Sequence, residues 1–328
     1  MSTRRREVLL AGAGLLAAAA LARAQPARKI HRIGFVLPTA RGARHDAFIE
    51  GLRELGYVEG RNVRVEARFA DGKPERLRAL IDELIALDVE VLVVGATIGA
   101  RAAKEATRTL PIVFAGSSDP VAGGVVGNLA RPEGNVTGLS FAASEGFAGK
   151  WLELIEEAVP GVSPVAVLWS SSNASASRFV SDLRNAAHGL KVELVAYHAA
   201  DVRQLDDALS AVGASKARGL IVTPSPFFLT QRRRLVEFAA RRRLAAMYFV
   251  EEFVEAGGLM SYGPSIIETY RGAARYVDRI LKGAKPADLP VEQSNKFALA
   301  LNLATARALG LEIPPAVLLR ASRVIEAK

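Results

Sequence analysis

The feature that most limits how this chain can fold is an alternation, from Ile30 onward, of short β-branched runs with amphipathic segments of helical period. A first round covers residues 33–37, 43–55, 63–69, 74–87, 89–94, 98–107, 112–115 and 136–141. A second round follows a helix at 147–158 and covers residues 165–169, 174–188, 192–197, 202–212, 219–223, 229–242 and 246–249. Such alternation is typical of parallel sheets with helices on both faces. It predicts an α/β protein with two doubly wound parallel-sheet lobes.

The C-terminal tail departs from this alternation. Its pattern predicts a strand, a helix, a Pro-containing linker, a strand and a helix, at 257–262, 265–282, 285–290, 297–301 and 304–309. We expect the tail to cross back between the lobes, so that hinge strands join them more than once. The expected first lobe is 30–141 with about 256–284, and the second is 142–255 with about 285–328. Half of the 328 residues are apolar, which is enough for two cores.

The first 24 residues have the pattern of a secretory signal peptide. Three arginines at 4–6 precede an uncharged stretch at 8–22, and Ala22-Arg23-Ala24 forms a small-residue cleavage site. This stretch is shorter than the roughly 20 residues of a membrane-spanning helix. We therefore expect cleavage after Ala24 and a mature protein in the periplasm. The run Arg5-Arg6-Glu7-Val8-Leu9 also resembles the twin-arginine export signal, with Val8 where Phe is usual, and both export routes stay open.

The composition and the missing motifs exclude several kinds of catalytic and metal site. The chain has no cysteine, which removes disulfides, thiol nucleophiles and Cys-ligated metals. Its four histidines have no metal-ligand spacing, and the mature chain lacks a nucleophile elbow, a dinucleotide fingerprint and a Walker A loop. The adjacent Glu251 and Glu252 are read either as a paired-carboxylate site or as a solvated hinge. We expect no enzyme activity, no metal and no cofactor.

The net charge of +9 is spread through the predicted helices. Its two dense clusters, at 232–234 and 241–243, fall on one helix and are read as a solvated face, because no recognition motif or aromatic interleaving accompanies them. We therefore expect no nucleic-acid partner.

Small hydroxyl residues and glycines dominate the loops that follow the predicted strands. Ligands of open parallel sheets bind at the carboxyl ends of the strands, where hydroxyl groups and helix N-terminal N–H groups favour an anion such as a carboxylate. The same residue types are also preferred helix caps, so each loop taken singly keeps a structural interpretation. The candidate ligand-binding residues from these loops are Thr39, Thr97, Ser117, Ser118, Asp119, Ser140, Ser171, Asn173 and Ser225.

Two aromatic residues at strand ends, Trp169 and Tyr262, are candidates for stacking on a flat ligand. Trp151 lies within a predicted helix at core spacing with Leu154 and Ile155, which favours a structural role.

Several segments resemble the bacterial ABC-transporter substrate-binding family that includes tryptophan and tyrosine binders. They are GLRELGYVEGRNV at 51–63, PIVF at 111–114, DPV at 119–121, ARPEGNVTG at 130–138, AGGLMSYGP at 256–264 and ILKGAKP at 280–286. The similar order and spacing run from about Ile30 to the C-terminus.

The resemblance implies a type I periplasmic binding-protein fold that closes on a small solute and delivers it to an inner-membrane ABC permease. It also implies that Thr97, residues 117–119, Ser140 and Tyr262 line the cleft. This chain has Ser170–Asn173 where many relatives have an Asn-Pro-rich loop, and Ser225-Pro226 where relatives often have Asp-Pro. The lost acidic residue weakens the case for an α-ammonium group. We therefore expect a small carboxylate-bearing solute, aromatic compounds and amino acids included, bound by a monomer.

The sequence supports three other functions to different degrees. A periplasmic sensing subunit of a signalling system would use the same fold and cleft, and the sequence does not separate it from a transport receptor. A periplasmic hydrolase or isomerase is disfavoured because no acid–base or nucleophile set is visible. A DNA-binding regulator of the same lobe design is excluded by the predicted signal peptide and the missing N-terminal helix-turn-helix.

Overall fold

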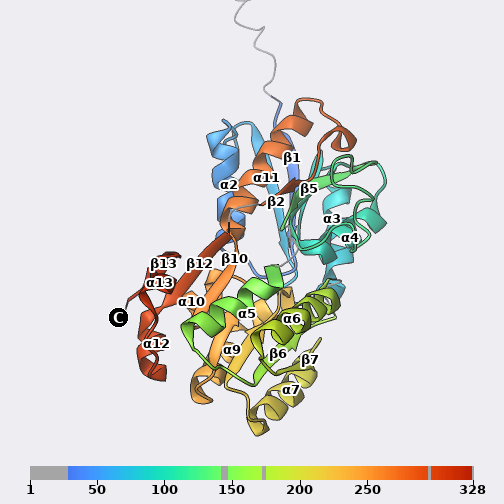
Figure 1. The fold of residues 1–328 in the computed structure, drawn as a ribbon. Helices are drawn as coiled ribbons and strands as arrows, with labels where there is room; N and C mark the ends of the chain where they lie inside the picture. Colours follow the sequence, from blue (N-terminus) through green and yellow to red (C-terminus); the bar gives the residue numbers. More distant parts are fainter. Residues whose placement is uncertain (1–28, 142–146, 172–174, 295–296, 327–328) are drawn as a thin grey trace, which may run out of the picture.

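The first of two sheets has six strands and lies in the upper lobe of Figure 1. The computed structural model describes residues 29–141, 147–171, 175–294 and 297–326. The strands are β1 (His31–Leu37), β2 (Val63–Phe69), β3 (Val91–Gly95), β4 (Ile112–Ser117), β5 (Val136–Ser140) and β11 (Glu292–Gln293). They run in the order β11-β5-β4-β3-β1-β2, and all are parallel.

Helices cover both faces of this sheet. One face is covered by α2 (Ala43–Glu54) and α11 (Ile266–Leu281), and the other by α3 (Leu77–Ala86), after the short η1 (Pro74–Arg76), and α4 (Ala96–Ala106). Every residue of β3, with the sequence VLVVG, is buried, as expected for a central parallel strand with helices on both sides.

The second sheet has seven strands. They are β6 (Val165–Trp169), β7 (Leu194–His198), β8 (Gly219–Val222), β9 (Ala245–Tyr248), β10 (Met260–Pro264), β12 (Phe297–Asn302) and β13 (Ala321–Ile325). The order is β13-β12-β10-β9-β8-β6-β7, so its parallel part repeats the doubly wound order of the first lobe. The predicted fold class is confirmed, with one departure: β12 runs antiparallel to β10.

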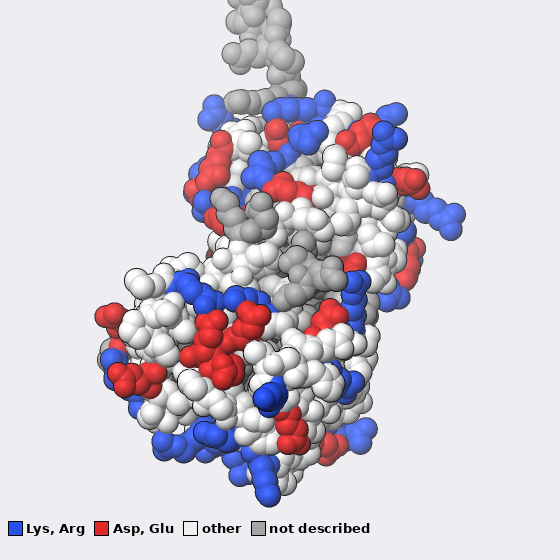
Figure 2. All heavy atoms as spheres, viewed as in Figure 1, with Lys and Arg blue, Asp and Glu red and all other residues white. Residues whose placement is uncertain are grey.

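Helices also cover the second sheet on both faces. One face carries α5 (Phe147–Ala158), α6 (Ala176–Leu190) and α13 (Pro315–Leu318), whereas α7 (Val202–Ala214), α8 (Pro226–Thr230), α9 (Arg232–Arg241) and α10 (Glu251–Glu255) cover the other. The short α12 (Leu303–Leu309) lies beside β13. Among the described residues, no helix is both long and apolar enough to cross a membrane. On the face shown in Figure 2, basic and acidic side chains lie on both lobes.

The expected division of the tail needs correction. Strand β10 belongs to the second sheet, where it pairs with β9 and β12, although 256–284 was expected in the first lobe. Helix α11 does lie in the first lobe, packed on α2 and β4. The chain then continues through η2 (Pro286–Asp288) to β11 in the first sheet and returns with β12. The chain thus passes between the lobes three times, after β5, β10 and β11.

A close approach of α2 and α11 explains one glycine of the sequence motif at 51–63. A Cβ atom at Gly51 would lie 2.5 Å from the carbonyl oxygen of Arg271. Glycine is therefore required for these two helices to pack at this distance. The Ser265 side chain caps the start of helix α11, where its hydroxyl oxygen accepts the backbone N–H of Glu268 at 3.3 Å.

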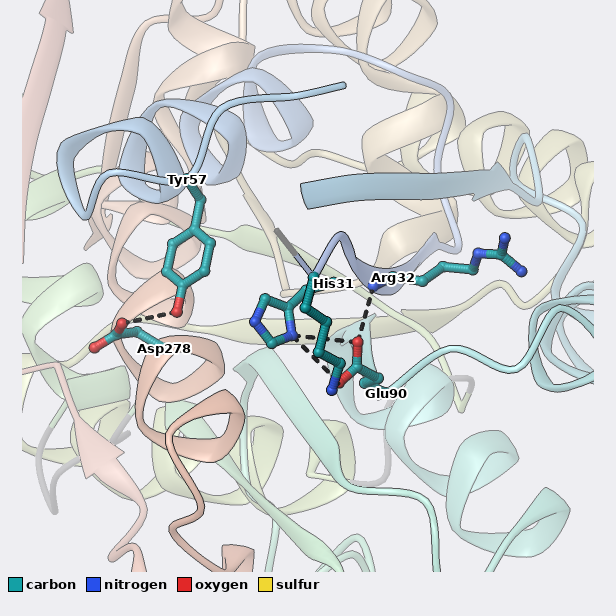
Figure 3. A network of polar contacts seen from close by, with 6 residues as sticks. His31, Arg32, Tyr57, Glu90 and Asp278 are labelled. Carbon is teal, nitrogen blue, oxygen red and sulfur yellow. Dashed lines mark hydrogen bonds and ion pairs between the residues drawn. The ribbon is translucent and has the colours of Figure 1, made fainter. Parts of the chain in front are cut away.

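The start of the described chain is held to the first lobe by Glu90, as Figure 3 shows. Its carboxylate accepts hydrogen bonds from Lys29 Nζ at 2.6 Å and from the backbone N–H of Arg32 at 3.3 Å, and lies 3.2 Å from Nδ1 of His31. Burial acts to raise the pKa of Glu90, but the hydrogen bonds from Lys29, His31 and Arg32 outweigh it, so the pKa is lowered. These contacts favour the charged carboxylate and tie β1 to the segment before β3.

Candidate ligand-binding site

A cavity of about 540 Å³ lies between the two lobes, at the carboxyl edges of both sheets. This size is within the usual range for small-molecule sites. Six of the predicted site residues line it: Thr39, Thr97, Ser118, Asp119, Ser140 and Ser225. They come from loops far apart in the sequence, which the doubly wound topology brings to one place.

The first-lobe wall is built on linked hydroxyl groups. The Thr97 and Ser117 hydroxyls hydrogen-bond at 2.8 Å, and Ser140 Oγ donates to the carbonyl oxygen of Ser117 at 3.1 Å. Ser117 itself is fully buried and does not line the cavity. It was predicted as a ligand contact, and the structure instead places it behind Thr97, as a partner that orients the threonine hydroxyl.

Asp119 combines a capping role with a place in the cavity wall. Its Oδ1 accepts the backbone N–H groups of Val121 at 3.2 Å and Ala122 at 2.9 Å. Within the described residues, Oδ2 takes no hydrogen bond. One oxygen therefore closes the turn, and the second is available to a positively charged group.

The backbone where β3 passes into α4, just before Thr97, is unusual. Ala96 lines the cavity with a φ of 61°, in the left-handed region that alanine rarely adopts. Next to it, a Cβ atom at Gly95 would lie 2.7 Å from the Tyr270 hydroxyl oxygen. The wall is therefore shaped by one residue that must lack a side chain and one held in a strained conformation.

The second-lobe wall carries five aromatic rings among aliphatic, polar and charged side chains, which include Arg178 and Asp182. Phe147 lies 5.0 Å from Phe297 and 5.8 Å from Trp151, centroid to centroid, and Trp151 lies 5.0 Å from Phe179. All four line the cavity, together with Phe249. Trp151 is fully buried and packs in the core of the lobe, as its helical spacing predicts, and it also borders the cavity.

The remaining predicted residues lie outside the cavity wall. Tyr262 is one layer behind it, stacked on Phe297 at 5.8 Å. Ser171 is exposed, with its hydroxyl 2.9 Å from Nε2 of His198. Trp169 also packs against that imidazole, at 4.7 Å between ring centroids. Direct contact of Tyr262 and Ser171 with a ligand stays a prediction, and neither residue lines this cavity. Asn173 lies outside the described residues.

Several residues of the cavity wall were not predicted from the sequence. Arg44 and Tyr270 line the cavity, and Arg44 Nη2 donates to Oε1 of Glu252 at 2.7 Å. Burial raises the pKa of Tyr270 to about 12, with the charge of Arg44 lowering it and that of Glu252 raising it. The Tyr270 hydroxyl is therefore neutral near neutral pH and can donate a hydrogen bond.

The acidic pair Glu251 and Glu252 is not a paired-carboxylate site. Glu251 Oε2 accepts from Arg323 at 3.2 Å within the second lobe, whereas Glu252 pairs with Arg44 of the first. In the part of the chain that the structure describes, no group of three or more His, Cys, Asp or Glu residues could hold a metal ion.

Known proteins with similar sequence and structure define the class. The family model described as ABC transporter substrate binding protein matches residues 29–325. The chain belongs to this family, whose members are substrate-binding proteins. A relative, the "Tyrosine-binding protein" of Clostridioides difficile (strain R20291), is 23% identical over 265 residues, or 81% of this chain and 76% of the relative.

Two solved structures have the same fold. A conserved domain protein from Vibrio cholerae is similar with a TM-score of 0.84 and 27% identity, covering 90% of this chain and 100% of the other. The ABC domain from Streptococcus pneumonia in complex with L-Trp also has a TM-score of 0.84, with 24% identity and the same coverage. The type I binding-protein fold implied by the sequence motifs is thus confirmed.

Proposed function

We propose that this protein captures a small carboxylate-bearing aromatic solute, with an aromatic amino acid as the first candidate, and delivers it to an inner-membrane ABC permease. The family match supports capture of a substrate. The names of two similar proteins, one tyrosine-binding and one complexed with L-Trp, support an aromatic amino acid.

The division of the cavity between the lobes is the observation that carries this proposal. Hydroxyl groups at Thr97, Ser118 and Ser140 and the neutral Tyr270 hydroxyl are suited to a carboxylate. The rings of the second lobe offer stacking and apolar contact to a flat side chain. A solute with a polar end and an aromatic end would contact both lobes, and such contacts favour the closed arrangement.

Asp119 bears on the choice between an amino acid and a simple acid. The serine at 225, where relatives often have aspartate, argues against an ammonium group. Asp119 nevertheless places a carboxylate in the cavity with Oδ2 free of hydrogen bonds to the described residues. We therefore favour the zwitterionic amino acid over a simple aromatic acid.

Export and partners complete the proposal. Residues 1–24 are proposed to direct export and to be removed after Ala24, leaving a monomeric periplasmic protein that begins at Gln25. These residues lie outside the described part of the chain.

The experiment is calorimetric titration of the mature protein, unfolded and refolded to remove any solute bound during expression. L-Tryptophan, L-tyrosine and L-phenylalanine are compared with tryptamine, which lacks the carboxylate, and indole-3-propionate, which lacks the ammonium group. We expect binding of an aromatic amino acid and at least tenfold weaker binding of tryptamine. A solute at 100 times its Kd also stabilises the fold by about 2.7 kcal/mol. Binding of a sugar with no response to the aromatic set would overturn the proposal.

A further inference from the structure

One ion pair crosses the cavity from lobe to lobe. Arg44 belongs to α2 of the first lobe and Glu252 to α10 of the second, and Nη2 and Oε1 are 2.7 Å apart. Their side chains are 14% and 22% exposed, so the pair is largely shielded from water. A charged hydrogen bond in such a place is stronger than an exposed surface pair.

This pair differs from the other ion pairs of the described residues in joining the two lobes. Every other ion pair between described residues joins two groups of the same lobe. On α10 itself, Glu251 and Glu255 both pair with Arg323, at 3.2 and 2.7 Å, and so remain within the second lobe. Glu252 alone of the three reaches across to the first lobe.

Two further contacts show that the lobes touch around the cavity. Ser118 and Ser175, one from each lobe, hydrogen-bond through their hydroxyl groups at 3.0 Å. A Cβ atom at Gly72 of the first lobe would lie 2.8 Å from Cγ2 of Thr230 in the second. The Arg44–Glu252 pair is thus part of a closed interlobe contact.

We propose that Arg44 and Glu252 are positioning residues that set solute affinity by stabilising the closed arrangement, with no contact to the solute required of either. The proposal rests on the proposed function in one respect, that the solute binds between the lobes. Apparent affinity is the intrinsic affinity scaled by the fraction of protein in the binding-competent form. Loss of the pair lowers that fraction and weakens binding of every solute that uses the cavity.

The absence of cysteine allows a direct test of closure. Cysteines introduced at the exposed Arg101 of α4 and Arg184 of α6 carry spin labels, one on each lobe, and the distance between them is measured by pulsed electron paramagnetic resonance. The variants are Glu252→Gln, Arg44→Met and the charge swap Arg44→Glu with Glu252→Arg. The control is Arg68→Met, which removes a 2.8 Å pair with Glu83 inside the first lobe.

In protein without solute, we expect both single variants to increase the share of long distances, and the swap to restore the wild-type distribution. With L-tryptophan as probe, Kd should rise about tenfold in each single variant, as for loss of a charged hydrogen bond. The swap should return Kd to within about threefold of wild type. Arg68→Met should change neither the distances nor Kd.

Two results overturn the proposal. One is that Glu252→Gln has the same distance distribution as the wild type, both without the probe and with it. The other is a Kd that the swap fails to restore although the distances return to wild type, which would make Arg44 a direct contact of the solute. If L-tryptophan binds neither the wild type nor any variant, the proposed solute is wrong. The distances measured without solute still decide whether the pair stabilises the closed arrangement.

Discussion

The two walls of the cavity are built in different ways. The first lobe presents short polar side chains, such as Thr97 and Ser140, that are hydrogen-bonded to the hydroxyl or the carbonyl oxygen of Ser117. The second lobe presents large rings, such as Trp151 and Phe179, that also belong to its hydrophobic core. A polar wall of this kind can change its contacts to a ligand at little cost to the fold, whereas the aromatic wall cannot.

This difference indicates how the two lobes divide the work of recognition. We expect hydrogen-bonding groups on the first lobe to set the orientation and charge of a bound solute. Rings on the second lobe offer apolar contact, and core packing fixes the positions of Trp151 and Phe179. Folding and binding are therefore separable in the first lobe and coupled in the second.

The largest expected effect is that of Trp151→Ala on the aromatic wall. Trp151 is fully buried, and its removal should lower the free energy of unfolding by about 3–5 kcal/mol, as for other buried aromatic residues. The measurement is equilibrium unfolding in urea. Trp151→Phe is the matched control: no described group is hydrogen-bonded to Nε1, so this variant should lose much less. An equal free energy of unfolding for Trp151→Ala and wild type would contradict the conclusion that the aromatic wall is part of the core.

Substitutions in the polar wall should have a smaller effect, and mainly on binding. Thr97→Ala and Ser118→Ala should each weaken solute binding by about 1 kcal/mol, or roughly fivefold in Kd, and leave the protein folded. Calorimetric titration measures the first effect and urea unfolding the second. Ser171→Ala, an exposed hydroxyl outside the cavity, should leave Kd unchanged. Unchanged affinity in both cavity variants would show that this wall does not hold the solute.

The two-residue β11 was missed, whereas most strands, such as β3 and β6, could be predicted from the sequence because they are apolar runs between helices of clear period. Strand β13 could not, since its sequence ASRVI is largely exposed at a sheet edge and lacks a buried pattern. The sheet to which β10 belongs was also predicted wrongly. Which neighbours a strand pairs with is decided by tertiary contacts, here those with β9 and β12.

The candidate site was predictable only as far as strand ends could locate it. Loops after β1, β3, β4 and β8 supply residues of the cavity wall because parallel strands end at one edge. Arg44 was missed because an arginine near the start of a helix is ordinarily solvated. Its partner is 208 residues away in the sequence, and no local pattern connects the two.

A third prediction concerns backbone strain in the polar wall. Ala96→Gly should raise the free energy of unfolding by up to about 1 kcal/mol, because glycine adopts a φ of 61° without the steric cost that alanine pays. Ala100→Gly is the control: this residue lies in the interior of α4, the helix that Ala96 begins, and the variant should lower the free energy of unfolding by about 1 kcal/mol or more. Thermal unfolding of both variants measures the contrast. A loss of stability in Ala96→Gly would mean that the loop carries no strain.

The smallest expected effect lies far from both walls, at Glu90, and depends on pH. The pKa of Glu90 is lowered in the folded protein from its ordinary 4.5. Its contribution to stability is therefore fully present above that ordinary value and is lost as the pH falls through the lower, folded-state pKa. Urea unfolding between pH 3 and pH 7 should show a shallower acid decline for Glu90→Gln than for wild type. Solute affinity at pH 7 should be the same in both, because Glu90 holds the start of β1 and does not line the cavity. A change in affinity would mean that a substitution at the opposite end of the sheet alters the polar wall. Folding and binding would then be coupled in the first lobe as well.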